Sequence, residues 1–263
     1  MDLGLKNKRA VVCGGSKGLG FSSAEALAAE GAKLFLLSRD EESLKDAAAK
    51  LLAAGSPEVN WANCDLTQHE SRQACIDKIK AEWSGIDILI HNVGGPKPSF
   101  VVDTTEQQWQ DGFDRLFIPV VHLNSAFVPG MKENKWGRII TITSLSVVEP
   151  ISFLSISNAL RSASTSLSKT LSDEVGKFGV TVNCVAPGMV RTDRTEDLLS
   201  SRIEKSGQSR EDYMKEMLKT IPASRLGEPK EFGAVVCFLC SEQASYVTGS
   251  TLCVDGGKRR STY

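Results

Sequence analysis

The chain has 263 residues, of which 41% are hydrophobic, and its formal net charge is −1 at pH 7. This length suits one large α/β domain or two small ones, and the near-neutral charge gives no indication of nucleic-acid or membrane-surface partners. No apolar run is long enough to cross a bilayer, and the N-terminal residues lack the apolar region of a signal peptide, so we expect a soluble, cytoplasmic protein.

The first predicted strand, Ala10–Cys13, ends at a glycine-rich turn that leads into an alanine-rich helix, Leu19–Glu30. Glycines let a backbone approach a ligand closely, and the free N–H groups of a first helical turn attract phosphate. The turn therefore predicts a dinucleotide site, although glycine-rich turns that only relieve crowding are also common. The residues expected to line the phosphates are Gly14, Ser16, Lys17, Gly18 and Leu19.

The second predicted strand, Leu34–Leu37, is followed by Arg39 at the place where a ribose-reading residue is expected. Together with Lys17, Arg39 provides two cations, which favour a cofactor with a 2′-phosphate. Asp40 offers an alternative, because its carboxylate could turn inward and accept the free ribose hydroxyl. The charges predict NADP(H) rather than NAD(H).

Apolar runs alternate with helical patterns along the rest of the chain, and several runs are continuous, as in strands buried on both faces. The remaining predicted strands are Val59–Ala62, Ile86–His91, Arg138–Thr143, Thr181–Ala186 and Thr251–Val254. The remaining predicted helices are Glu41–Ala54, Gln68–Trp83, Glu106–Leu116 and beyond, Ser155–Phe178 and Glu228–Ser241. These repeated units predict a single doubly wound, Rossmann-like α/β domain over residues 1–263, with a parallel sheet of about seven strands and helices on both faces.

Ligands of such sheets bind beyond the carboxyl ends of the strands, where this chain places its polar and glycine residues. The largest irregular stretch lies between Pro187 and Pro222 and contains a short helical pattern, Glu211–Leu218. Because this stretch follows a strand end, we expect residues 190–222 to form a lid over a substrate.

The seven cysteines are mostly placed in apolar strands or helices, which favours buried free thiols. Cys237 and Cys240 have the spacing of a metal or redox pair, but no second pair or histidine cluster lies nearby in sequence. We therefore predict core packing for these thiols and no metal site.

In their order and spacing, the motifs resemble those of the short-chain dehydrogenase/reductase family, from Leu5 to about Gly257. They are Gly14-x-x-x-Gly18-x-Gly20, Asp65-Leu66, Asn92-Val93-Gly94, Gly137–Ile140 leading to Thr143-Ser144, Val182-Asn183-x-Val185-x-Pro187-Gly188 and Val254–Gly257. Among subgroups, the chain resembles bacterial 3-oxoacyl-acyl-carrier-protein reductases.

This resemblance implies an NADP(H)-dependent oxidoreductase that interconverts a carbonyl and an alcohol on a small molecule. It also implies a symmetric homotetramer built from the helix Ser155–Phe178, the helix before it and the C-terminal strand. The cofactor contacts that it implies beyond the glycine turn and Arg39 are Asp65, Leu66, Asn92, Gly94, Pro187, Gly188 and Thr192.

The resemblance breaks at the catalytic residues. The family reduces carbonyls with an Asn-Ser-Tyr-Lys set, and these positions fall at Leu116, Ser144, Ser157 and Arg161. Only the serine is retained. A serine hydroxyl is far less acidic than a tyrosine, and arginine does not deprotonate in proteins, so Ser157 is a poor proton source and Arg161 cannot relay protons. Loss of a general acid costs about 10²–10⁴ in rate without abolishing hydride transfer.

Three interpretations follow. The chain is a working reductase with a relocated acid, for which the candidates are His91, then Tyr213, then a water held by Ser157 and Arg161. Alternatively, it is a catalytically weak or inactive NADP(H)-binding relative that regulates or scaffolds. In the third interpretation, Ser157 and Arg161 serve a substrate that needs no acid there, such as an anion held by Arg161.

We favour the two enzyme interpretations, because an intact cofactor turn and Ser144 suit hydride chemistry. The residues assigned to catalysis are Ser144, Ser157, Arg161 and His91. The basic tail that begins at Lys258 is predicted to be a solvated terminus.

Overall fold

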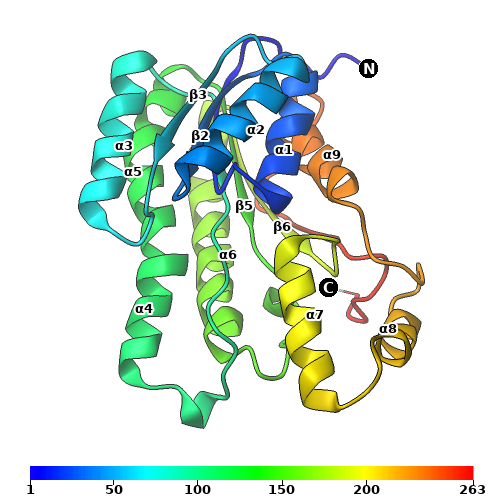
Figure 1. The fold of residues 1–263 in the computed structure, drawn as a ribbon. Helices are drawn as coiled ribbons and strands as arrows, with labels where there is room; N and C mark the ends of the chain where they lie inside the picture. Colours follow the sequence, from blue (N-terminus) through cyan, green and yellow to red (C-terminus); the bar gives the residue numbers. More distant parts are fainter. Residues whose placement is uncertain (263) are drawn as a thin grey trace.

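The computed structural model describes residues 1–262, apart from the side chain of Lys205, and it shows one sheet flanked by helices (Figure 1). The strands are β1 (Arg9–Cys13), β2 (Lys33–Ser38), β3 (Val59–Asn63), β4 (Ile88–His91), β5 (Gly137–Ile142), β6 (Val180–Pro187) and β7 (Thr251–Val254). All strand pairs are parallel, in the order β3-β2-β1-β4-β5-β6-β7. The predicted doubly wound fold is therefore confirmed.

The helices cover both faces of the sheet. They are α1 (Gly18–Ala29), α2 (Glu41–Ala53), α3 (His69–Glu82), α4 (Glu106–Leu116), α5 (Ile118–Glu133), α6 (Ser155–Val175), α7 (Asp193–Ser206), α8 (Arg210–Lys219) and α9 (Pro229–Cys240). The first buried core joins the sheet to α1, α2 and α9, and the second joins its other face to α3, α5 and α6. No helix of the described chain combines the length and the apolar character that crossing a bilayer requires.

The helix predicted to run on past Leu116 is two helices, α4 and α5. Phe117 joins them with φ −112° and ψ −53°, and Pro119 lies in the first turn of α5. Proline suits a first turn because its missing N–H would have no partner there. The sequence placed this helical stretch correctly but not its break.

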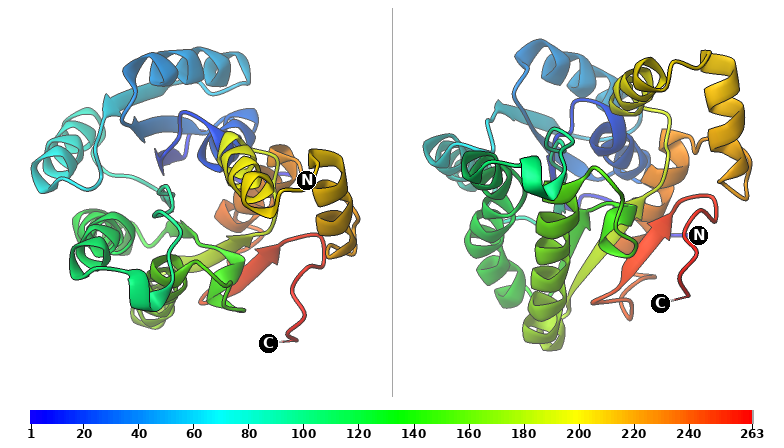
Figure 2. Two further views of the ribbon diagram at one scale, coloured as in Figure 1. Left: turned by 60° about the horizontal axis from the view of Figure 1, so that its bottom comes forward. Right: turned by 90° about the horizontal axis from the view of Figure 1, so that it is seen from below.

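The segment predicted to be largely irregular after β6 is mostly helical, and this expectation was wrong. The helix α7 begins after Thr192, whose side chain accepts a hydrogen bond from the Thr195 amide, and it ends at Gly207, where φ is +68°. Figure 1 places α7 and α8 below the sheet, and both views in Figure 2 place them on the side of the molecule away from α3.

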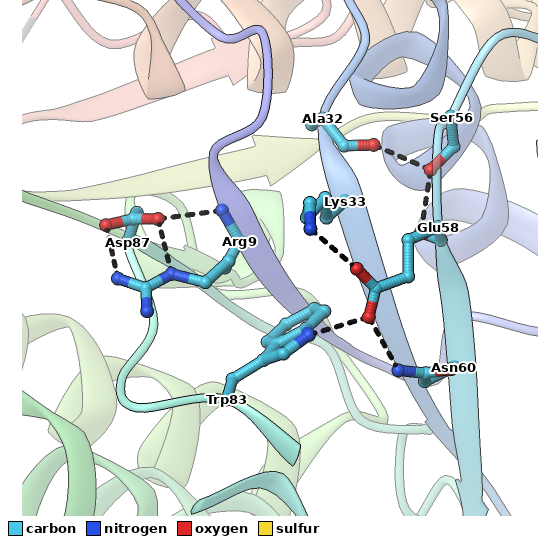
Figure 3. Close-up of polar contacts among 8 residues, drawn as sticks. All are labelled: Arg9, Ala32, Lys33, Ser56, Glu58, Asn60, Trp83 and Asp87. Atoms are coloured by element: carbon cyan, nitrogen blue, oxygen red, sulfur yellow. Dashed lines mark hydrogen bonds and ion pairs between the residues drawn. The ribbon is translucent and has the colours of Figure 1, made fainter.

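Paired charges fasten the amino ends of the strands (Figure 3). Arg9, the first residue of β1, forms an ion pair with Asp87 at 3.0 Å, directly before β4. Lys33, the first residue of β2, pairs at 2.7 Å with Glu58, which also accepts a hydrogen bond from Trp83 Nε1 at 2.9 Å. These contacts join neighbouring strands at the edge of the sheet opposite the glycine turn.

Candidate active site

A cavity of about 530 Å³ lies at the carboxyl ends of the strands. It brings together every residue that the sequence assigned to the site except His91. The assigned residues that line it are Gly14, Ser16, Lys17, Gly18, Leu19, Arg39, Asp65, Leu66, Asn92, Gly94, Ser144, Ser157, Arg161, Pro187, Gly188 and Thr192. Segments that follow β1, β2, β3, β4, β5 and β6 therefore meet around one space.

The glycine turn needs its glycines for conformation and for space. Gly14 and Gly18 have φ of +58° and +60°, a region that L-residues rarely adopt, and a Cβ on Gly20 would lie 2.2 Å from the Gly14 carbonyl oxygen. Lys17 precedes α1 in an extended conformation, with no side-chain hydrogen bond capping the helix. The first N–H groups of α1 are thus left for an anion, which fits the pyrophosphate of a dinucleotide.

Charged side chains surround the part of the cavity that follows β2 and β3. Burial alone would raise the pKa of Asp65, but hydrogen bonds from Thr67 and the charges of Arg39 and Arg115 together lower it. Asp65 therefore stays ionised at neutral pH. Arg115, on α4, was missed by the sequence interpretation, because nothing in the pattern of α4 shows that its last turn borders the cavity.

Asp40 does not offer the inward carboxylate that would favour a free ribose hydroxyl. Its Oδ1 accepts a hydrogen bond from the Ser43 amide at 2.7 Å and so caps α2. This contact with Ser43 also lowers the pKa of Asp40. Arg39 and Lys17 line the cavity, whereas Asp40 does not.

Two serine side chains, Ser144 and Ser157, line the cavity beyond β5. The Oγ of Ser144, just past β5, accepts a hydrogen bond from the Ser146 amide at 3.2 Å, so its own proton is available to a ligand. Ser157, in the first turn of α6, has no side-chain hydrogen bond to any described residue. Ser157 and Arg161 are four residues apart and therefore lie on the same face of α6.

Arg161 is partly buried and donates hydrogen bonds to three backbone carbonyls. Its Nη1 donates to the oxygens of Ile142 at 3.0 Å and Thr143 at 3.1 Å, and its Nη2 donates to Val93 at 3.2 Å. Burial, and then the nearby charge of Arg194, lower its pKa to about 10, which leaves it cationic at neutral pH. The guanidinium links the ends of β4 and β5 and holds a fixed positive charge beside the two serines.

The structure does not bring His91 or Tyr213 to the cavity, so neither predicted side-chain acid is in place. His91 is 3% exposed, and its Nε2 lies 2.9 Å from Asn124 Oδ1. Burial lowers the pKa of His91 to about 4, which keeps the ring neutral near pH 7. Tyr213 lies on α8, which contributes no side chain to the lining.

The cavity also includes cations that the sequence interpretation missed. Arg194 and Arg202 reach it from α7, and Lys258 reaches it from the segment after β7. The prediction of a solvated terminus was wrong for Lys258, because this side chain is half-buried and lines the cavity, whereas Arg260 is exposed. The helix α7 was missed because residues 190–222 show no clear helical pattern over that part. Lys258 was missed because nothing in the sequence indicates that the C-terminal segment returns to the cavity.

Comparison with known proteins identifies relatives along nearly the whole chain. Residues 14–259 match the family model described as enoyl-(acyl carrier protein) reductase. The 3-oxoacyl-[acyl-carrier-protein] reductase FabG of Chlamydia muridarum is 32% identical over 253 residues, which cover 96% of this chain and 98% of the relative. The human dehydrogenase/reductase SDR family member 4 is 33% identical over 254 residues, covering 96% of this chain and 88% of the relative.

A solved structure with the same fold carries both a cofactor and a substrate. The L-sorbose reductase of Gluconobacter frateurii, solved in complex with NADPH and L-sorbose, superposes with a TM-score of 0.94 at 31% identity. The match covers 99% of this chain and 100% of that protein.

Proposed function

This chain belongs to the short-chain dehydrogenase/reductase family of oxidoreductases, and we propose that it uses NADP(H) to interconvert a carbonyl and an alcohol. The observation that carries the proposal is the single cavity in which a phosphate-binding turn, Ser144 and the cationic Arg161 meet. The FabG relatives make 3-oxoacyl compounds the first substrates to test.

The cofactor is held at the end of the cavity formed by the segments after β1 and β2. The N-terminus of α1 binds the pyrophosphate, and Lys17 and Arg39 bind the 2′-phosphate. Asp65 and Asn92 contact the adenosine half. The side-chain amide of Asn92 also donates to the Gly14 carbonyl at 3.4 Å and so supports the turn. Bound NADPH supplies the hydride.

Ser144 and Arg161 act where negative charge develops on the substrate oxygen. The Ser144 hydroxyl donates a hydrogen bond to the carbonyl oxygen, and Ser157 is placed to donate a second one. The partly buried charge of Arg161 stabilises the developing alkoxide, because electrostatic effects are strong where water is excluded. The carbonyl carbon gains a hydride and the oxygen gains a proton, while NADPH becomes NADP⁺.

Water is the proton source that this arrangement favours. Neither His91 nor Tyr213 lines the cavity, and a serine hydroxyl is too weak an acid to replace tyrosine. A water bound between Ser157 and the free N–H groups of Arg161 can deliver the proton to the substrate oxygen. We expect rates about 10²–10⁴ below those of a tyrosine-assisted reductase.

Stopped-flow measurement of NADPH oxidation tests the function. The panel is 3-oxoacyl thioesters, quinones and simple ketones, and the account predicts turnover with at least one class. Ser144→Ala should lower kcat by about tenfold or more, because the transition state loses a hydrogen bond to its oxygen. The matched control is Ser125→Ala, which removes an exposed hydroxyl of α5 outside the cavity.

The alternative is that the chain binds NADP(H) but turns over poorly or not at all, and acts as a regulator or scaffold. The hydrogen bonds from Arg161 to three backbone carbonyls favour this alternative, because the N–H groups that make them are not free to bind a substrate. NADPH binding with no oxidation in any panel member would support it. So would activity gained only when Ser157→Tyr is combined with Arg161→Lys.

We also propose a homotetramer. The edge strand β7 leaves Leu252 43% exposed, and Phe238 on α9 is 40% exposed. An open sheet edge with apolar side chains is commonly covered by another chain. Light scattering at micromolar concentration should give the mass of four chains, and a monomer would contradict the proposal.

A further inference from the structure

Three cationic side chains line the cavity from the segments that follow β6 and β7. Arg194 and Arg202 lie on α7, and Leu198 between them lines the cavity as well. Residues four apart lie along one face of a helix, so this face of α7 borders the cavity over two turns. Lys258 reaches the same space from the segment after β7.

The order of the strands separates these cations from the residues proposed to hold the cofactor phosphates. Lys17 and Arg39 follow β1 and β2, whereas α7 follows β6 and Lys258 follows β7, at the other side of the sheet. The start of α7 borders the glycine turn, because a Cβ on Gly18 would lie 3.8 Å from the Thr192 side chain, whereas Arg202 lies two turns farther along the helix. Lys17, Arg39 and the N-terminus of α1 are the groups proposed for the cofactor phosphates, and Arg202 and Lys258 lie farthest from them, two turns along α7 and after β7.

These like charges lie close enough to act on one another. Burial and then the charge of Arg202 lower the pKa of Lys258, against the opposing effects of Asp255 and Glu149. In the same way, the charge of Arg194 adds to burial in lowering the pKa of Arg161. Neighbouring charges of one sign repel one another, and an anion bound between them offsets this repulsion.

Acidic side chains lie near these three cations, among them Asp193 in the cavity lining, but none of the described ones pairs with them directly. None of the three cations forms an ion pair within 4.0 Å with a described residue, although Arg191 pairs with Glu228 at 3.1 Å beside them. The nearby Glu196 of α7 pairs with Arg210 of α8. Arg194 donates one hydrogen bond, from Nη2 to the Pro96 carbonyl at 3.2 Å, and its other donors remain available to a ligand.

We propose that the substrate is a carbonyl compound carrying a carboxylate or phosphate group, which Arg194, Arg202 and Lys258 bind while its carbonyl faces Ser144. The proposal rests on the reductase function given above and specifies its substrate class. Arginine suits this role because its planar donors match the oxygens of either anion. The anionic group also anchors the substrate, which compensates in part for the missing tyrosine by orientation.

Two matched pairs of ketones test the proposal and distinguish the two anions. Acetoacetate is compared with its methyl ester, and hydroxyacetone phosphate with hydroxyacetone. We expect kcat/KM to be at least about tenfold higher for the anionic member of one pair, and that pair identifies the group. If the neutral member is reduced as well as its anion, or better, in both pairs, the proposal is overturned while the reductase function stays intact.

Charge-removing variants then locate the effect. Combining Arg202→Gln with Lys258→Gln should lower kcat/KM for the anionic ketone by about tenfold, with KM carrying most of the change. The neutral ketone and the affinity for NADPH should change less than about twofold. The control is Lys80→Gln, an exposed cation of α3 outside the cavity. Equal losses for both ketones would overturn the proposal.

A binding measurement keeps the test decisive if no ketone is reduced, in which case the proposed function fails. Inorganic phosphate and 3-hydroxybutyrate are titrated calorimetrically into the protein saturated with NADP⁺. Binding that is lost in the Arg202→Gln, Lys258→Gln variant supports the anion site even without turnover. If neither anion binds to the wild-type complex, the proposal is overturned as well.

Discussion

At the amino ends of the strands, Arg9 and Lys33 each form an ion pair, with Asp87 at 3.0 Å and Glu58 at 2.7 Å (Figure 3). At the carboxyl ends, the cations that line the cavity form no ion pair within 4.0 Å with a described residue. They are Lys17, Arg39, Arg115, Arg161, Arg194, Arg202 and Lys258. Arg9 and Lys33 are thus neutralised within the chain, whereas the cations of the cavity lining are left for ligands.

The difference separates stability from function within one fold. Paired charges join neighbouring strands and contribute modestly to folding. Uncompensated cations around a cavity repel one another, so they cost stability unless anions bind, and they concentrate anionic ligands there. Arg161 is the exception, because it is partly buried at the carboxyl end and is satisfied by carbonyls rather than by a carboxylate.

The largest expected effect on stability comes from replacing Arg161. Arg161→Met leaves three backbone carbonyls without their donors, and we expect the free energy of unfolding to fall by about 3 kcal/mol. Urea denaturation measures it. Arg191→Met, which breaks only an exposed pair with Glu228, should cost less than about 1 kcal/mol. Equal losses in the two variants would show that Arg161 is not a structural link between β4 and β5.

The next largest effect is expected from removing the charge of Arg39, which is proposed to bind the 2′-phosphate. Arg39→Gln should weaken NADPH binding by about ten- to 100-fold, which is about 1.4–2.8 kcal/mol, because the 2′-phosphate loses a charged partner. Binding of NADH, which lacks that phosphate, should change less than about twofold. Lys50→Gln, on the exposed face of α2, is the control. Parallel losses for both cofactors would refute the assignment of Arg39.

The pH dependence of stability tests whether His91 is sealed in the fold rather than open to the cavity. Its folded pKa is about 4, below the usual 6.5, so the unfolded chain takes up the proton first as the pH falls. The stability that neutral His91 contributes is present above pH 6.5 and is lost as the pH falls toward 4. We expect about 2 kcal/mol of loss between pH 7 and pH 5 from this residue.

His91→Gln removes that titration while keeping a polar side chain that can face Asn124. Thermal unfolding at the two pH values should show a correspondingly smaller pH dependence in the variant than in the wild type. An unchanged pH dependence would mean that His91 is already solvated in the folded protein.

The smallest expected effect concerns the paired end. Asp87→Asn breaks the ion pair with Arg9, whose side chains are 14% and 23% exposed, and should cost about 1 kcal/mol in unfolding free energy. The dissociation constant for NADPH should stay the same, since the pair lies at the opposite end of the sheet. If this variant bound NADPH more weakly while its stability was unchanged, the amino-end pair would have a role in binding, which would contradict the separation of stability from function.

The sequence predicted the strands well because each is a short apolar run between turn signals, as with β2 and β6. The cofactor end was predictable too, because local chain geometry requires Gly14 and Gly18 directly before α1. The helix α7 was missed, since its polar first turn, Asp193–Glu196, shows no apolar stripe.

The catalytic and substrate parts of the site depend on distant contacts, which local patterns do not encode. His91 is the last residue of β4, where an active-site residue can lie, but its side chain is buried against Asn124. Lys258 looked like a solvated terminus, but it folds back to the cavity. Arg161 lines the cavity, but its three carbonyl partners could not be predicted, because they come from the ends of β4 and β5, which only the folded chain brings together.

Calorimetric titration of NADPH and of NADH into the wild-type protein, at one ionic strength, tests most directly whether the unpaired cations are there to bind ligands. The account predicts that NADPH binds at least about tenfold more tightly, a difference of about 1.4 kcal/mol. Equal affinities, or tighter binding of NADH, would contradict it.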